Sequence, residues 1–280
     1  MTLRVALIQT RTPATQEAAL AHAAPLIRQA AKEGAKLILT PEGVNLLEQR
    51  REGRDQAVTD QDADAAVAGL RALASELGVW LLIGSAIVRS GREGDGRAAN
   101  RSLLIDDGGE IVAAYDKLHV FDVTLPDGES WKESAVIRPG DGAVVATTPW
   151  GGLGMTVCYD VRFPHLYRQL AKAGAAMIAV PAAFTRPTGE AHWETLLRAR
   201  AIETGCFILA PAQGGAHEDG RRTWGRSMIV GPWGEVMARA EGDEPCVLTA
   251  DLDMEAVDRA RRAVPQLTHD RDFDPPAARP

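Results

Sequence analysis

Three side chains that could act together in catalysis each stand directly after an apolar, strand-like run of the sequence. They are Glu42, Lys117 and Cys158. In α/β proteins, reactive groups are commonly placed at the ends of strands. A thiolate is a nucleophile, a buried carboxylate can take the thiol proton, and an ammonium can stabilise the negative charge that forms on the attacked group. Together the three residues predict thiol-based attack on the carbon of an amide or a nitrile.

Each of these residues also has an ordinary structural explanation when it is taken alone. A free cysteine is often a small apolar core residue, and Cys206 and Cys246 lie in apolar runs typical of that role. Glu42 could start a helix, and Lys117 could be an exposed lysine on an edge strand. Holding a cysteine of ordinary pKa as a thiolate at pH 7 also costs about 2 kcal/mol of free energy. A reactive cysteine therefore needs a partner that takes its proton.

A histidine is the common partner of a reactive cysteine, and the sequence has six. Of these, His119 and His192 are the candidates for a Cys–His pair of the kind that thiol proteases use. In that alternative Lys117 would be dispensable. A metal enzyme is disfavoured because the sequence has neither paired cysteines nor a His-Glu-x-x-His motif, so no residue is assigned to a metal.

Composition narrows the class of protein. The chain has 280 residues, is 45% hydrophobic and carries a formal charge of −7, with its basic residues scattered, which argues against a nucleic-acid partner. No apolar run approaches the roughly 20 residues that span a bilayer, so no membrane association is predicted. The sequence opens on a strand-like run rather than a signal peptide, and it has only three cysteines. These features predict a cytoplasmic protein.

Apolar runs and helical periodicity alternate along the chain, as in mixed α/β folds. A helix is predicted over residues 18–31, with Pro25 kinking or breaking it. Hairpins are expected near Asp106–Gly109 and Pro232–Gly234, and a long functional loop over 122–142. The similar order of the two halves predicts one domain of two face-to-face sheets, over residues 1–255. Residues 256–280 are predicted to be an extension that packs on a neighbouring chain or frays.

Three ordered motifs give the sequence a family resemblance. Thr40-Pro-Glu-Gly43, Tyr115–Asp122 and Val157–Pro164 resemble the nitrilase superfamily of carbon–nitrogen hydrolases, and the likeness runs from about Leu3 to about Asp253. The resemblance implies an α-β-β-α four-layer sandwich. It also implies a Glu42–Lys117–Cys158 triad that needs no metal or organic cofactor, and a homodimer or larger homo-oligomer.

The resemblance also implies two further catalytic groups. The superfamily has a second glutamate near its site, and Trp131–Ser134 resembles the segment that carries it, which makes Glu133 the fourth catalytic candidate. Glu129 is a weaker candidate for the same role. In the mechanism we expect, the backbone N–H of Tyr159 holds the oxyanion together with Lys117.

Several segments of the second half are similar to the Nit branch, and most to amidases that hydrolyse deaminated glutathione. They are Pro181–Thr185, Thr188–Glu203, Ala212–His217 and Pro232–Glu235. This likeness implies hydrolysis of a carboxylate-bearing 2-oxo acid amide through a thioester, with release of an amine or ammonia. An omega-amidase, an N-carbamoyl amino acid hydrolase and a general aliphatic amidase are the alternatives. A non-catalytic binding protein would be expected to lack a triad member.

Residues 184–189 are expected to lie near the substrate pocket, which makes Phe184, Thr185 and Arg186 candidate substrate contacts. Arg186 departs from the uncharged residue expected there by the resemblance. It could pair with a substrate carboxylate, or it could be a solvated loop residue.

Overall fold

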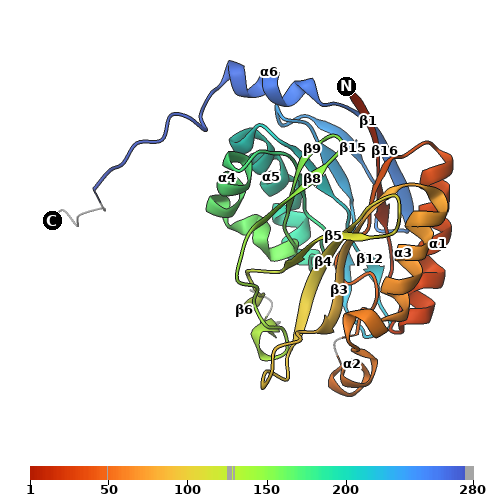
Figure 1. Cartoon of the computed structure of the whole chain (residues 1–280). Helices are drawn as coiled ribbons and strands as arrows, with labels where there is room; N and C mark the ends of the chain where they lie inside the picture. The colour runs from red at the N-terminus through yellow and green to blue at the C-terminus, as the bar shows by residue number, and fades with distance from the viewer. Residues whose placement is uncertain (49, 125–127, 129, 275–280) are drawn as a thin grey trace.

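The computed structural model describes residues 1–48, 50–124, 128 and 130–274, and two six-stranded sheets form its centre (Figure 1). The first sheet has the order β16-β1-β2-β3-β4-β5 and the second the order β15-β14-β11-β10-β9-β8. The strands of the first are β1 (Thr2–Gln9), β2 (Leu37–Leu39), β3 (Trp80–Arg89), β4 (Ala98–Ile105), β5 (Ile111–Asp116) and β16 (Cys246–Asp253). Those of the second are β8 (Val144–Thr148), β9 (Gly151–Met155), β10 (Ala175–Ala179), β11 (Phe207–Ala210), β14 (Met228–Val230) and β15 (Val236–Arg239).

Helices cover the outer face of each sheet. On the first sheet lie α1 (Gln16–Lys32) and α3 (Ala65–Leu77), and on the second lie α4 (Pro164–Lys172) and α5 (Arg186–Thr204). The four layers confirm the predicted α-β-β-α sandwich (Figure 1). The predicted break at Pro25 is wrong, because α1 runs through this residue without interruption. Burial of the inner face of α1, which includes Ala23 and Ile27, outweighs the backbone hydrogen bond that Pro25 cannot make.

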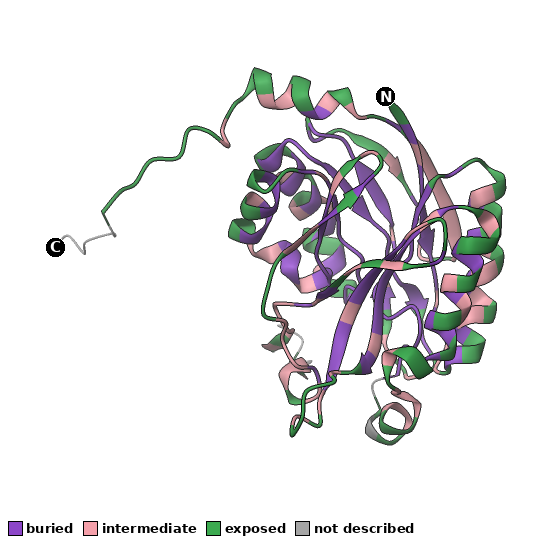
Figure 2. Cartoon of the chain, in the orientation of Figure 1, coloured by how far each residue is buried: buried purple, intermediate pink, exposed green. Residues whose placement is uncertain are grey.

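Alternating side chains of the first sheet fill two separate cores. Figure 2 shows that the strands of this sheet are largely buried. Leu7 and Leu39 point between the sheets, where they meet the cluster that contains Met155 and Met177. Ile8 and its neighbours point the other way, toward the helices. Successive side chains of a strand point to opposite faces of the sheet. A strand buried on both faces therefore needs apolar residues at every position. Each fully buried aliphatic side chain contributes about 1.5–3 kcal/mol to folding.

Short elements connect the layers and surround the site. The expected hairpins are confirmed as β4–β5 and β14–β15. The long segment from residue 122 contains a small hairpin and a 3₁₀ turn, whereas the candidate Glu129 lies outside the described residues. The remaining elements are α2 (Arg51–Ala57), η1 (Gln61–Ala63), β6 (Asp122–Thr124), β7 (Ser130–Lys132), η2 (Glu133–Ala135), η3 (Cys158–Arg162), β12 (Gly214–Ala216) and β13 (Arg222–Trp224).

The last helix, α6 (Glu255–Ala263), packs on the chain's own second sheet, at the start of the segment predicted to be an extension. Its Arg261 donates to the carbonyl oxygens of Ala175 and Thr204 at 2.7 and 3.1 Å, and Val257 is buried. After α6 the chain still contacts α4 and α5 through Gln266 and Asp270, and it then leads away from the body of the sandwich (Figure 1). No helix within the described residues has the length and apolar character needed to cross a membrane.

Candidate active site

The loop after β2 carries Glu42 and is fixed from both sheets. The Thr40 hydroxyl donates to the carbonyl of Leu82 at 3.1 Å and accepts from the N–H of Gly84 at 3.0 Å. The side chain of Gln213, which follows β11, donates to the carbonyl oxygen of Glu42 at 2.9 Å. Glu42 therefore stands in the gap between the sheets, where only 7% of its surface is exposed.

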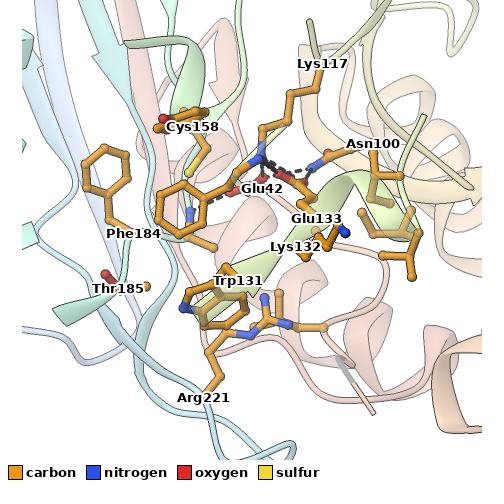
Figure 3. A pocket seen from close by; sticks show the side chains of 18 of the residues that line it. Glu42, Asn100, Lys117, Trp131, Lys132, Glu133, Cys158, Phe184, Thr185 and Arg221 are labelled. Atoms are coloured by element: carbon orange, nitrogen blue, oxygen red, sulfur yellow. Dashed lines mark hydrogen bonds and ion pairs between the residues drawn. The ribbon is translucent and has the colours of Figure 1, made fainter. Parts of the chain in front are cut away.

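Lys117 directly follows β5 and reaches the same gap. Its N–H donates to the carbonyl of Asn100 on β4 at 3.0 Å, which continues the sheet by one residue. The ammonium Nζ lies 3.0 Å from Glu42 Oε1 and 2.9 Å from Glu133 Oε2 (Figure 3). Only 2% of the lysine side chain is exposed, so two carboxylates balance one buried cation.

Cys158 begins the 3₁₀ turn that follows β9, and its backbone has φ +50°. A side chain in this left-handed region is strained by about 1–3 kcal/mol, so the surrounding contacts must hold it. One of them is the Cys158 N–H, which donates to the carbonyl of Pro181 at 2.8 Å. Another comes from Asp160, which accepts the N–H of Val157 at 2.8 Å and the hydroxyl of Tyr115 at 2.7 Å. Asp160 thereby joins the cysteine turn to β5.

Fixed donors orient the two carboxylates. Asn100 donates to Glu42 Oε1 at 2.8 Å, and the N–H of Ala183 donates to Glu42 Oε2 at 2.9 Å. The N–H of Phe121 donates to Glu133 Oε2 at 2.6 Å. The Glu42 carboxylate also lies beside the Cys158 thiol, and each group shifts the pKa of the other. The structure therefore brings together the four residues that the sequence predicts as catalytic: Glu42, Lys117, Glu133 and Cys158.

The charges of this cluster set its protonation states. Burial would raise the pKa of Glu42, but the Lys117 cation and hydrogen bonds from Cys158, Lys117 and Asn100 hold it below its usual value. Burial first, and then the Glu42 charge, raise the pKa of the Cys158 thiol well above its usual range. Burial opposes the charge on Lys117, yet Glu133 and Glu42 outweigh it and raise the pKa of the ammonium. The resting site is thus a carboxylate beside a neutral thiol, which is the state a general base requires.

A cavity of about 310 Å³ opens at the thiol. Phe184 and Thr185, both predicted substrate contacts, line it, and so does Tyr159, whose N–H directly follows the nucleophile. The structure does not bring Arg186 to this cavity, because Arg186 is exposed as the first residue of α5. The cationic side chains that line the cavity, apart from Lys117, are those of Arg54, Lys132, Arg162 and Arg221.

The imidazoles of the Cys–His alternative have other partners. His119 Nδ1 lies 2.7 Å from Asp160 Oδ1, and its ring stacks on Phe163. His192 Nδ1 lies 3.3 Å from a guanidinium nitrogen of Arg162. No hydrogen bond in the described part of the chain joins either histidine to Cys158, and no group of three or more metal-ligating side chains is found there.

A family model for carbon–nitrogen hydrolases matches residues 4–262, which is nearly the whole chain. The chain belongs to the carbon–nitrogen hydrolase family. It is a hydrolase of carbon–nitrogen bonds other than peptide bonds. The match ends at residue 262, within α6.

Curated relatives of this carbon–nitrogen hydrolase agree over most of its length. A deaminated glutathione amidase of Yersinia enterocolitica is 42% identical over 95% of this chain and 92% of its own. A deaminated glutathione amidase of Mus musculus is 37% identical over 94% of this chain and 81% of its own. These relatives confirm the resemblance noted in the sequence.

Solved structures of similar proteins share the sandwich. The NitFhit protein of C. elegans has a TM-score of 0.87 and 34% identity, over 96% of this chain and 65% of its own. Nit3 of Saccharomyces cerevisiae, a member of branch 10 of the nitrilase superfamily, has a TM-score of 0.84 and 28% identity, over 97% of each chain. An amidase of Nesterenkonia, 29% identical over 94% of this chain and 98% of its own with a TM-score of 0.76, was solved with acrylamide added to its active-site cysteine.

Sequence reasoning missed several residues of this carbon–nitrogen hydrolase site. Asn100 lies mid-strand with no local pattern to mark it, because its partner Glu42 comes from another part of the chain. Asp160 and Arg162 lie within the cysteine motif itself, so the motif carried a signal for both. Trp131 and Arg221 are brought to the cavity by two separate hairpin regions, which no spacing along the chain reveals.

Proposed function

We propose that this enzyme hydrolyses the amide of a small, carboxylate-bearing 2-oxo acid, of the deaminated glutathione type, through a thioester on Cys158. The observation that carries the proposal is the buried contact of the Cys158 thiol, the Glu42 carboxylate and the Lys117 ammonium at the wall of one cavity. The names of the curated relatives support the substrate class.

In the first half-reaction, Glu42 takes the thiol proton and the sulfur attacks the amide carbonyl. A carbon–sulfur bond forms, and the carbonyl π pair moves onto oxygen, where Lys117 Nζ and the N–H of Tyr159 stabilise the negative charge. The carbonyl then re-forms as the carbon–nitrogen bond breaks. Glu42 returns its proton to the departing nitrogen, so an amine or ammonia leaves and the acyl group remains on Cys158 as a thioester.

In the second half-reaction, Glu42 takes a proton from water, and the resulting hydroxide adds to the thioester carbon. The carbon–sulfur bond breaks when the second tetrahedral centre collapses, which releases the acid, and the thiolate recovers its proton from Glu42. One carboxylate thus serves as base and acid in alternation. It is suited to this because Asn100 and the N–H of Ala183 fix both of its oxygens.

Glu133 acts through Lys117 in this proposal. Both of its oxygens lie within 3.0 Å of Lys117 Nζ, which keeps the ammonium charged and directed at the thiol. Without Glu133, Lys117 would keep its ion pair with Glu42 and lose the second contact that fixes its position.

The cavity supports an acidic substrate. Arg162 lines it four residues after the nucleophile and lies over the ring of Phe184, 5.5 Å from the centroid. No carboxylate among the described residues lies within ion-pair distance of Arg162, so its charge is available to a ligand. We assign the carboxylate of the acyl part to Arg162, with Phe184 and Thr185 beside it. The exposed position of Arg186 favours the solvated alternative for that residue.

We also propose that the enzyme is a homodimer or a larger homo-oligomer. Exposed apolar side chains gather where α5 meets the edge of the second sheet, since Ile202 lies against Gly234, next to Trp233. Trp233 is 63% exposed and Ile202 52%, and Val236 and Met237 of edge strand β15 are each 37% exposed. Exposed apolar side chains gathered in this way, around Trp233 and Ile202, favour a protein interface.

A substrate panel tests the proposed reaction. Amides of 2-oxo dicarboxylic acids, N-carbamoyl amino acids and short aliphatic amides are compared by kcat/KM, with the amine or ammonia product measured. We expect the 2-oxo acid amides to be preferred and Cys158→Ala to be inactive on all of them. Preference for an N-carbamoyl or aliphatic substrate would replace the proposal with that alternative, and binding without any turnover would indicate a non-catalytic protein.

A further inference from the structure

Gln213 is a fully buried polar residue that no step of the proposed mechanism uses, and it does not line the catalytic cavity. Its side-chain amide has a partner for each of its donors and acceptors. Oε1 accepts from the Thr10 hydroxyl at 3.0 Å and from the Thr12 N–H at 3.1 Å. Nε2 donates to the Thr12 hydroxyl at 2.7 Å and to the backbone carbonyl of Glu42 at 2.9 Å. An amide can make no more bonds than these, so its orientation is fixed.

These hydrogen bonds join the two sheets at the residue that carries the base. Thr10 and Thr12 come directly after β1 of the first sheet, whereas Gln213 follows β11 of the second. The loop with Glu42 extends from the first sheet, and the turn with Cys158 extends from the second. The distance between base and nucleophile therefore depends on how the sheets are held at this point, and Gln213 bonds to both sides.

The carboxylate end of Glu42 depends on Gln213 as well. The N–H of Gln213 donates to the carbonyl of Ala182 at 2.8 Å. The N–H of the same peptide group, which belongs to Ala183, donates to Glu42 Oε2 at 2.9 Å. Hydrogen bonds in such a chain strengthen one another. Gln213 thus holds the carbonyl of Glu42 through its side chain and the carboxylate through one peptide group.

The two oxygens of Glu42 differ in their free lone pairs. Oε1 accepts from Lys117 at 3.0 Å and from Asn100 at 2.8 Å, which occupies both of its lone pairs. Among the hydrogen bonds of the described residues, Oε2 accepts only the N–H of Ala183. One lone pair of Oε2 therefore stays free to receive a proton.

We infer that Gln213 is a positioning residue, which directs the free lone pair of Glu42 Oε2 at the Cys158 thiol. It touches neither the substrate nor the reacting atoms, and it acts by fixing both ends of the residue that takes the proton. This inference rests on the proposed function, in which Glu42 is the base.

Two measurements test this role. The first is kcat and KM for a 2-oxo acid amide. The second is the rate of alkylation by iodoacetamide as a function of pH, followed on the peptide that contains Cys158. In alkylation the carbon–sulfur bond forms, iodide leaves and the thiol proton passes to Glu42, so the reaction reports the same proton transfer without an amide substrate.

Gln213→Met keeps the length of the side chain and removes the hydrogen bonds of the amide. We expect kcat to fall on the order of 100-fold with KM little changed, which is the cost of a reacting group displaced by about 1 Å. Alkylation near neutral pH should slow as well. Its acid limb should move to higher pH, because a Glu42 that loses contact with Lys117 and Asn100 regains a higher pKa. A residue that only supports the fold would leave this limb in place.

Thr12 offers a milder pair of variants that retain the glutamine. Thr12→Val removes one partner of the amide, and we expect it to lower kcat about 3- to 10-fold, the range of one neutral hydrogen bond. Thr12→Ser keeps the hydroxyl and should retain the activity. The control is Thr204→Val, at another fully buried threonine, whose hydroxyl donates to the carbonyl of Arg200 at 2.7 Å. It lies at the end of α5 opposite the cavity and should change neither kcat nor the acid limb.

The outcomes separate positioning from stability and from the choice of substrate. An unchanged kcat and acid limb in Gln213→Met would overturn the inference. If this variant does not fold, equal kcat values for Thr12→Val and Thr12→Ser overturn it instead. An equal loss of kcat in Thr204→Val would also overturn it, because the effect would then follow stability. The expected changes in alkylation, without turnover of any 2-oxo acid amide, would support the positioning role and overturn the proposed substrate.

Discussion

At the scale of single residues, the proposed mechanism depends on one buried cation, Lys117, that two carboxylates share. Lys117 keeps Glu42 ionised, and Glu42 in turn keeps the neighbouring thiol neutral until a substrate arrives. In the resting site of this kind of cysteine enzyme, the thiol is protonated and the base is a carboxylate. A Cys–His pair instead rests as a thiolate beside an imidazolium.

This arrangement predicts the pH profile. Because the pKa of Glu42 is lowered from 4.5, the base form is present above about pH 5 and is lost only as the pH falls through that lowered value. The pKa values of Cys158 and Lys117 are raised, so neither loses its proton near neutrality. We expect kcat/KM to be flat between about pH 6 and 8. An inflection near 6.5 that disappears in His119→Gln would contradict this and favour the histidine alternative.

The backbone of Cys158 predicts an unusual order of stability. At φ +50° glycine is unstrained, whereas any other residue is held in a costly conformation. Cys158→Gly should therefore be more stable to denaturant than Cys158→Ala by about 1 kcal/mol, the reverse of the usual order. Urea unfolding of the two inactive variants measures this difference. A more stable alanine variant would show that the backbone relaxes once the thiol is removed.

The grouping of Glu42, Lys117 and Cys158 could be predicted from the sequence, because each lies close after a strand and belongs to a local motif. Residues whose contacts join distant parts of the chain could not be predicted in this way. Asn100 acquires its role only when β4 and the loop after β2 meet, and Arg221 only when its hairpin reaches the cavity. The sequence predicts that residues 184–189 lie near the pocket, and Phe184 and Thr185 do line it. Arg186 is exposed at the start of α5, and Arg162 lines the cavity instead.

At the scale of elements, the site depends on how closely β3 passes the loops of both sheets. A Cβ built on Gly84 would lie 1.9 Å from the carbonyl oxygen of Thr40 and 2.6 Å from Pro181 Cβ. Thr40 precedes Glu42 in the same loop. The carbonyl of Pro181 accepts the N–H of Cys158. The absence of a side chain at Gly84 thus lets the base and the nucleophile approach each other.

Gly84→Ala is therefore expected to damage both stability and activity. Backbone atoms cannot move aside as a flexible side chain would, so we expect a loss of at least about 2 kcal/mol of unfolding free energy. A reduced kcat should accompany it, because Glu42 and Cys158 are pushed apart. The matched control is Gly96→Ala, where an added Cβ meets nothing within 4 Å. Equal stability of the two variants, measured by thermal unfolding, would contradict the close approach.

At the scale of the whole molecule, two sheets packed face to face place the ends of three strands, β2, β5 and β9, around one gap. The similar order of strands and helices in the two halves predicted two sheets packed face to face, because periodicity shows which faces are buried. The sequence pattern could not predict that α1 continues through Pro25. Whether the helix is interrupted there depends on its packing against the first sheet.

The proposed oligomer gives a prediction at the same scale. Sedimentation should show a species of at least twice the 30.0-kDa chain mass, held by the apolar patch around Trp233 and Ile202. Trp233→Glu combined with Ile202→Glu should shift it toward monomer, because a charge cannot be buried there without a partner. Phe273→Glu, at a side chain 85% exposed outside the patch, is the control. A monomeric unmodified enzyme would contradict the assignment.

The central claim is that Cys158 carries the acyl group of the substrate. The most direct measurement is the intact mass of enzyme quenched in acid during turnover of a 2-oxo acid amide, followed by peptide mapping. We predict a mass increase equal to the acyl fragment, located on the peptide that contains Cys158, with no increase and no turnover in Cys158→Ala. Turnover by Cys158→Ala, with no acylated species in the unmodified enzyme, would contradict the account.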